Sequence, residues 1–236
     1  MTLKNFDEDS IRVNSNEWLK PYHAPNVQSE IFRWYGQIGK DIFKEKTSQS
    51  KLVSLDYGCG EGATTNYFLS QGFEAFGIDI NKDSIEIALS RFPILQNRLF
   101  VVPFELETLP LKSIFIDLVT ARNVLYYLPP QTLTHTLSIL AKNMSPHGIL
   151  YATMMKSGGY YYQNSIPLKN GMRRVQFKNN RLVRETDILF VNNEEDLISR
   201  FTNFDLIELG QSLDFYLRSD SPGDYHYTCT FRVKSG

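Results

Sequence analysis

Cysteine is scarce in this 236-residue sequence, which contains only Cys59 and Cys229, far apart and in no metal-ligand spacing. This scarcity excludes a disulfide-rich scaffold and favours a reducing compartment, although two cysteines can still form one bridge. The sequence also lacks an apolar run near the ~20 residues that cross a bilayer, and its N-terminus lacks a signal-peptide core. We therefore expect a cytoplasmic protein of enzyme size with no membrane partner and no metal.

Acidic residues are absent from the stretch between Lys156 and Arg184, which carries seven basic residues. The rest of the chain contains 18 of the 25 basic residues and all 26 acidic ones. The net charge of −1 is therefore the sum of a basic segment and an acidic remainder. Such a segment is either a solvated face or a binding site for an anionic substrate. The overall pI of about 6.4 makes nucleic acid an unfavoured partner.

Short apolar runs and amphipathic stretches alternate from residue 51 onward. The pattern predicts strands over 51–57, 74–80, 98–103, 113–122 and 147–155, and helices over 63–72, 82–92 and 130–144. This alternation implies right-handed crossovers and a parallel sheet with helices on both faces. A capped helix over 192–203 and two closely spaced strands, 204–213 and 225–234, predict an antiparallel pair at one edge.

The basic stretch interrupts this regularity with residues that alternate on either side of Asn179-Asn180, a pair suited to a two-residue hairpin turn. We expect an inserted β-hairpin over the carboxyl edge of the sheet, where open α/β sheets bind ligands. The predicted fold is therefore α/β, a doubly wound, mostly parallel seven-stranded sheet with an antiparallel last strand and a hairpin lid.

The segment LDYGCGEGATT, residues 55–65, places three glycines between a predicted strand and a predicted helix. Glycines at such a turn let the backbone approach a ligand closely. The spacing also satisfies the loose dinucleotide pattern G-x-G-x-x-G/A, with Asp79 about 20 residues on, so an NAD-dependent oxidoreductase remains an alternative. However, Asp56 and Glu61 bracket the glycines, and we expect Glu105 and Asp117 on the same side. For Asp117 there is an alternative, because it starts a buried run and can instead cap the edge of the sheet. These carboxylates would repel a pyrophosphate and suit a cationic ligand.

Five motifs in order resemble class I S-adenosylmethionine-dependent methyltransferases of the small-molecule type, over roughly residues 50–155. LDYGCGEG resembles the family's first motif, and FGIDI the second. FELETLPL resembles the adenine-contacting segment, and IDLVTARNVLYYLP the fourth motif. LAKNMSPHGIL resembles the turn into the fifth strand, although His147 replaces a glycine there.

The resemblance implies S-adenosylmethionine as cofactor and S-adenosylhomocysteine as product. By this resemblance Asp79 would bind the ribose hydroxyls, Glu105 the adenine amino group, and the Leu106 backbone N–H the adenine ring. The cofactor-binding residues expected in this way are Asp56, Gly58, Cys59, Gly60, Asp79, Ile80, Glu105, Leu106, Arg122 and Asn123.

We expect one methyltransferase domain over residues 1–236. It comprises an N-terminal helical lid (1–50), a cofactor-binding core (51–155), an inserted substrate cap (156–190) and a C-terminal helix and strand pair (191–236). Substrate specificity should come from the lid and the cap, because the cofactor occupies the strand ends.

The expected reaction is in-line methyl transfer to oxygen or nitrogen of a small, anionic or carbohydrate-type metabolite. Tyr22, Tyr161, Arg173 and Arg174 are the candidate substrate contacts, because arginine offers bidentate geometry to anions and tyrosine an aromatic surface. His23, Tyr126 and His226 are the candidate bases, and the residues favour none of the three. An RNA methyltransferase and a non-catalytic S-adenosylmethionine-binding module remain alternatives, and the oligomeric state stays open.

Overall fold

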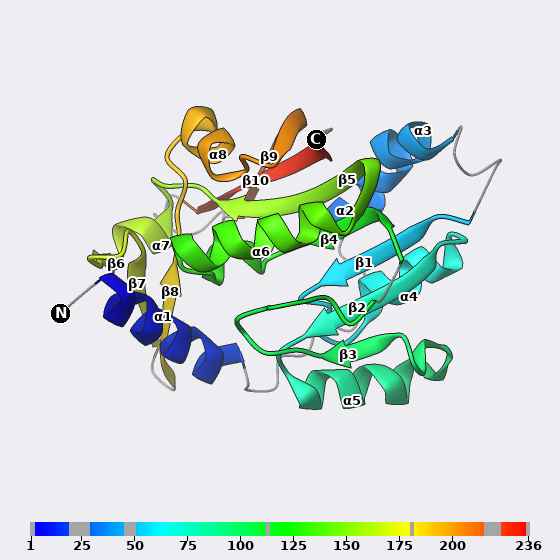
Figure 1. Ribbon diagram of the computed structural model, residues 1–236. Coiled ribbons are helices and arrows are strands. Elements are labelled where there is room, and N and C mark those ends of the chain that lie inside the picture. The colour runs from blue at the N-terminus through cyan, green and yellow to red at the C-terminus, as the bar shows by residue number, and fades with distance from the viewer. Residues whose placement is uncertain are drawn as a thin grey trace.

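A seven-stranded sheet organises the computed structural model, which describes residues 3–18, 29–44, 51–111, 114–179, 182–214 and 223–234 (Figure 1). The strand order is β3-β2-β1-β4-β5-β10-β9. β1 to β5 pair in parallel, whereas β10 runs antiparallel to both β5 and β9. This confirms the predicted, mostly parallel sheet. The strands are β1 (Val53–Tyr57), β2 (Glu74–Asp79), β3 (Leu99–Val101), β4 (Ile116–Ala121), β5 (Met144–Met155), β9 (Phe204–Asp214) and β10 (Asp224–Val233).

Helices cover both faces of the sheet. Leucines of α6 (Pro130–Lys142) and Leu197 of α8 (Glu194–Arg200) pack in the large core on one face. On the other face, α4 (Ala63–Ser70) packs in an aromatic cluster with the successive segments α2 (Ser29–Trp34), η1 (Tyr35–Gly39) and α3 (Lys40–Phe43). α5 (Lys82–Arg91) covers the end of the sheet near β3, together with the short turn η2 (Pro93–Leu95).

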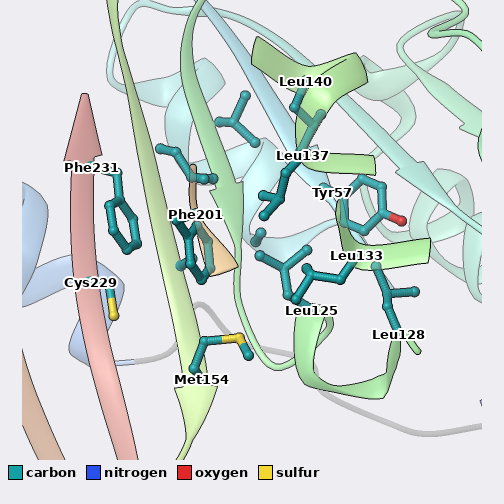
Figure 2. Close-up of a cluster of buried hydrophobic side chains, with 14 of the residues drawn as sticks. Tyr57, Leu125, Leu128, Leu133, Leu137, Leu140, Met154, Phe201, Cys229 and Phe231 are labelled. Carbon is teal, nitrogen blue, oxygen red and sulfur yellow. The ribbon is translucent and has the colours of Figure 1, made fainter. Parts of the chain in front are cut away.

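The large core explains why these apolar runs form strands and an amphipathic helix. Figure 2 shows Leu133, Leu137 and Leu140 of α6 pointing toward the sheet. Phe201, at the end of α8, stacks on Phe231 of β10 with ring centroids 4.3 Å apart and planes 10° apart. Burial of such large apolar side chains is the main favourable contribution to folding.

β5 begins three residues before the predicted start, at Met144 instead of His147. The pairing of β4 with β5 shifts between Ile116 and Leu118, so the extra residues enter the strand through an irregularity. His147 lies there with a φ of +63°, a conformation that glycine favours. None of the helices in the described ranges combines the length and the apolarity that a bilayer crossing needs.

A second, antiparallel sheet of order β6-β7-β8 contains the predicted hairpin. Its strands are β6 (Ser165–Pro167), β7 (Arg173–Asn179) and β8 (Leu182–Ile188), and α7 (Tyr160–Gln163) precedes them. Asn179 pairs with Leu182, so Asn179 belongs to β7 and not to the predicted turn, and Asn180 lies outside the described residues. The small sheet lies at the end toward which the arrows of β1, β2 and β3 point, and α1 (Leu3–Trp18) lies beside β8 (Figure 1).

Candidate cofactor and acceptor site

The glycine loop turns sharply between β1 and α4. Gly58, Gly60 and Gly62 have φ values of +73°, +51° and +75°. The Gly58 and Cys59 N–H groups both donate to the Ile78 carbonyl, at 2.9 and 3.0 Å, which folds the loop against β2. A Cβ on Gly58 would lie 2.7 Å from a methyl group of Val124, whereas a Cβ on Gly60 would meet nothing within 4 Å. The loop is therefore packed on one side and open at Gly60.

Asp79, the last residue of β2, holds the open side of this loop. Its carboxylate accepts the Gly60 N–H and the Asn81 N–H, each at 2.8 Å. Burial raises the pKa of Asp79, and these backbone donors oppose that rise. The Ile80 N–H is a third backbone donor to Asp79. A carboxylate has about four acceptor sites, so Asp79 keeps capacity for a ligand hydroxyl. A polar acceptor beside an uncovered glycine fits the hydroxyl-bearing ribose of the implied cofactor.

Asp56 lies beneath the glycine loop, with only 5% of its surface exposed. It accepts hydrogen bonds from Thr120 at 2.8 Å and Thr65 at 3.2 Å. Burial raises the pKa of Asp56 to about 6, and the hydroxyl donors oppose this shift. These contacts join β1, β4 and α4 below the loop, and direct contact with a ligand stays a prediction.

Glu61 and Asp117 do not lie beside the glycine loop as carboxylates that could face a ligand. Glu61 is buried in an ion pair with Arg91, with 2.7 Å between Oε2 and Nη1. Asp117 is the second residue of β4, and its carboxylate accepts the Val53 N–H at 3.0 Å at the amino edge of the sheet, which is the edge-capping alternative. Glu105 is exposed in the bend after β3, whereas Leu106 is buried. Of the expected carboxylates, Asp79 ends β2 and Glu105 follows β3, and contact of either with a ligand stays a prediction.

The other predicted loop contacts would act through the backbone. Cys59 packs its side chain among Ile85, Ala88 and Leu95, and burial raises the pKa of its thiol well above the ordinary value. Ile80 follows Asp79 and is half-buried.

The segment that follows β4 is held from two sides. Arg122 forms an ion pair with Glu30 of α2, with 2.6 Å between Nη2 and Oε1. Asn123 has a φ of +52°, and its N–H donates to the Thr153 hydroxyl at 2.8 Å. That hydroxyl donates in turn to Asn123 Oδ1 at 3.0 Å. β5 and α2 thus fix Arg122 and Asn123 at the carboxyl edge.

Two of the three candidate bases come together near this segment. Tyr126 belongs to η3 (Leu125–Tyr127) and is buried, and its ring lies 5.8 Å from the ring of His226, centroid to centroid. His226 pairs with Met155, and Thr228 pairs with Thr153, so His226 lies two register positions beyond Thr153, the residue that holds Asn123. His23 and Tyr22 lie outside the described residues.

The candidate substrate arginines differ in their surroundings. Arg174 donates to Asp9 and to the buried Asp187, each at 2.8 Å, and these carboxylates raise its pKa. These contacts join α1 to the small sheet and do not support a substrate clamp at Arg174. Arg173 donates to Ser165 and lies over the Tyr162 ring, 4.3 Å from its centroid. No carboxylate of the described ranges pairs with it.

Tyr161, the remaining candidate substrate contact, is half-buried in α7. Its backbone N–H donates to Asp224 Oδ1 at 2.9 Å, which attaches α7 to the start of β10.

Sequence reasoning missed the residues that position the site: Glu30, Thr65, Thr120 and Thr153. One signal was available, because a single hydroxyl or carboxyl residue interrupts the apolar runs of β1, β4 and β5 near their carboxyl ends. Buried polar side chains need partners, so such residues on neighbouring strands are expected to pair. The ion pair of Glu30 with Arg122 joins positions 92 residues apart and had no local signal.

Comparisons with known proteins agree with this geometry. A family model described as a methyltransferase domain matches residues 26–219. No curated protein matches the chain. Among solved structures, a Pyrococcus horikoshii protein is similar at 15% identity and a TM-score of 0.65, covering 94% of this chain and 99% of its own.

Two further structures show the same fold. An S-adenosylmethionine-dependent methyltransferase from Methanosarcina mazei is 15% identical, with a TM-score of 0.64 and coverage of 89% of this chain and 100% of its own. The CcbJ methyltransferase from Streptomyces caelestis is 13% identical, with a TM-score of 0.56 and coverage of 83% and 89%. Because the family model spans well over half of the chain, this protein belongs to the methyltransferase domain family, and it is an S-adenosylmethionine-dependent enzyme of class I, as its motifs predicted.

Proposed function

We propose that this protein transfers a methyl group from S-adenosylmethionine to oxygen or nitrogen of a small molecule. The observation that carries the proposal is the position of the small sheet and α1 over the carboxyl edge. There, Leu189 donates to the Tyr126 carbonyl and Asn14 donates to the Tyr127 carbonyl, at the end of β4. An additional layer over the edge that binds cofactor favours a small acceptor over a nucleic acid.

The cofactor would be held by the residues at the strand ends. Asp79 would accept from the ribose hydroxyls with its remaining acceptor capacity, Glu105 and the Leu106 N–H would meet the adenine, and the loop at Gly60 allows close approach. When bound, S-adenosylmethionine supplies an electrophilic methyl group on a sulfonium. The protein contributes position, which is worth roughly 7–11 kcal/mol of the barrier for well-aligned reactants.

His226 is the proposed proton acceptor for the methyl-accepting group. Its imidazole is half-buried at the carboxyl edge, two register positions beyond Thr153, and the Tyr126 ring packs beside it. A neutral imidazole nitrogen takes a proton from a hydroxyl or ammonium group near neutral pH. Such a base contributes about 10²–10⁴-fold to rate.

Arg173 is the proposed contact for an anionic or carbohydrate-type acceptor. It pairs with Ile188 across the small sheet, next to Leu189, which binds the Tyr126 carbonyl. Its guanidinium is only partly buried, and the Tyr162 ring beneath it holds the charge in place. A positive charge without a carboxylate partner in the described ranges suits a phosphate or carboxylate.

Calorimetry with the purified protein tests the cofactor. S-adenosylmethionine and S-adenosylhomocysteine should release heat on binding, NADH should not, and Asp79→Ala should weaken S-adenosylhomocysteine binding about 10–100-fold, since it removes charge-assisted hydrogen bonds. Heat with NADH and none with S-adenosylhomocysteine would reject the proposed function.

A panel of phosphorylated and neutral sugars, assayed for methyl transfer, tests the acceptor. With the accepted compound, Arg173→Ala should raise KM about 10–100-fold with little change in kcat, because a charge-assisted pair is lost in the ground state and the transition state alike. Arg174→Ala is the matched control and should lower Tm, since it leaves Asp187 without its cation. An unchanged KM in Arg173→Ala would remove this contact from the proposal.

A further inference from the structure

Two consecutive carbonyls of η3 accept hydrogen bonds from segments that are distant in sequence. The Leu189 N–H, directly after β8, donates to the Tyr126 carbonyl at 2.8 Å. Asn14 Nδ2, from α1, donates to the Tyr127 carbonyl at 2.6 Å. The small sheet and α1 are thus each hydrogen-bonded to the segment that follows β4. From here on, the cap means these two elements together, and not the insert 156–190 alone.

Asn14 uses the full hydrogen-bonding capacity of its side chain. Besides the Tyr127 carbonyl, Nδ2 donates to the Asp187 carbonyl at 2.8 Å. Oδ1 accepts the Asp187 N–H at 2.7 Å and the Thr186 hydroxyl at 3.0 Å. A primary amide has two donor hydrogens and two lone pairs, so all four are used. The amide meets the outer edge of β8 as a neighbouring strand would, and it is fully buried.

Buried polar contacts make the two parts of the cap one body. Ser10 donates to Asp187 at 2.6 Å and accepts from Asn170 at 3.1 Å, while Arg174 bridges Asp187 and Asp9. Asp187 is fully buried, so separating α1 from the small sheet would take Ser10 from its carboxylate and Asn14 from its backbone groups, and would take Asp9 from Arg174. Displacement of α1 therefore displaces the small sheet, although about 150 residues separate them in sequence.

We infer that Asn14 is a positioning residue, which couples docking of the cap to the arrangement of residues 122–127 at the site. This inference rests on the proposed function. Arg122 and Asn123 immediately precede η3, and η3 places Tyr126 beside His226. A ligand that binds the ordered segment favours the docked cap, and an undocked cap lowers the measured affinity by the fraction of protein that is competent.

Asn14→Asp tests the coupling, because it keeps the shape of the side chain but replaces the donor that faces the Tyr127 and Asp187 carbonyls. Asn16→Asp is the matched control, with the same change on an exposed position of the same helix. In calorimetry with S-adenosylhomocysteine, Asn14→Asp should bind about tenfold more weakly at 25 °C, as expected when a tenth of the protein is competent. Asn16→Asp should bind as the wild type does.

A folded Asn14→Asp variant that binds S-adenosylhomocysteine within twofold of the wild type would overturn the inference. Wild-type protein that binds no S-adenosylhomocysteine would instead reject the proposed function. Hydrogen exchange of the wild type, with and without S-adenosylhomocysteine, provides a test that needs no variant. Residues 3–18, 122–127 and 182–188 should gain protection together, and a gain confined to 122–127 would contradict the coupling.

Discussion

Protonation of Asp56, the buried carboxyl group below the glycine loop, should affect the stability of the protein. Its pKa of about 6 exceeds the ordinary 3.8, because burial penalises the carboxylate more than Thr65 and Thr120 stabilise it. The folded protein therefore binds this proton more tightly than the unfolded chain does. The free energy of unfolding should fall as pH rises from about 4 to about 6, with a total loss of at most ~3 kcal/mol above that range.

Asp56→Asn removes this penalty. The amide can donate to one threonine hydroxyl and accept from the other, so the contacts below the loop persist. Relative to the wild type, the variant should gain about 1–3 kcal/mol of unfolding free energy between pH 4 and pH 7. Urea denaturation at pH 4, 5, 6 and 7 measures the difference. A difference that does not change with pH would show that Asp56 does not titrate in this range.

For single residues, the sequence predicted their place along a strand better than it predicted their hydrogen-bond and ion-pair partners. Asp56 and Asp79 end strands at the carboxyl edge because they directly follow apolar runs, which is local information. Glu61 was placed wrongly, because its partner, Arg91, is 30 residues away. Of the two roles left open for Asp117, capping the sheet edge is the one observed, because Asp117 lies near the start of its strand. Pairing across strands depends on tertiary register, which one sequence does not contain.

At the scale of elements, two glycines of the same loop have different roles: Gly58 is needed for packing, and Gly60 leaves room for a ligand. Both glycines have a positive φ. A Cβ added to Gly58 would clash with Val124, whereas a Cβ added to Gly60 would enter open space. The two positions differ in what surrounds them, so the same substitution should have different effects.

Gly58→Ala should lower the free energy of unfolding by about 2–4 kcal/mol, because left-handed strain and overpacking add. Gly60→Ala should lower it by only about 1–2 kcal/mol from strain. Gly60→Ala should nevertheless weaken S-adenosylhomocysteine binding more than tenfold, since the added methyl occupies the ligand's approach. Denaturation and calorimetry on both variants check this, and equal losses of stability would contradict the packing argument.

The elements that sequence reasoning identified are those with apolar periodicity. α1 was not identified as a separate helix, because the residues buried between positions 7 and 16, where its side chains are described, are polar: Asp7, Ser10 and Asn14. These positions have helical spacing, but a pattern search for apolar residues does not detect them. β6 was missed because it has three residues, two of them exposed. The hairpin was found because its strands alternate.

At the scale of the molecule, the cap and the large sheet share one core. Met172, Val175, Ile188 and Phe190 belong to the same buried cluster as Leu125, Leu137 and Phe231. A shared apolar core couples the stability of its parts, so the cap should not unfold before the sheet.

Differential scanning calorimetry should therefore show a single transition, with the calorimetric enthalpy equal to the van't Hoff enthalpy. S-adenosylhomocysteine at 100 times its Kd should add about 2.7 kcal/mol, which corresponds to a rise in Tm of roughly 5–10 °C. A separate low-temperature transition that is lost on removal of residues 3–18 would show instead that the cap is an independent unit.

The position of β10 affects how this chain acquires its structure during synthesis. β10 lies between β5 and β9, so the strand nearest the C-terminus occupies an interior place in the sheet. Until residue 233 has left the ribosomal exit tunnel, β5 keeps an unpaired edge and β9 has no strand to join. The nascent chain therefore exposes a long apolar strand, β5, until residues 224–233 can pair with it.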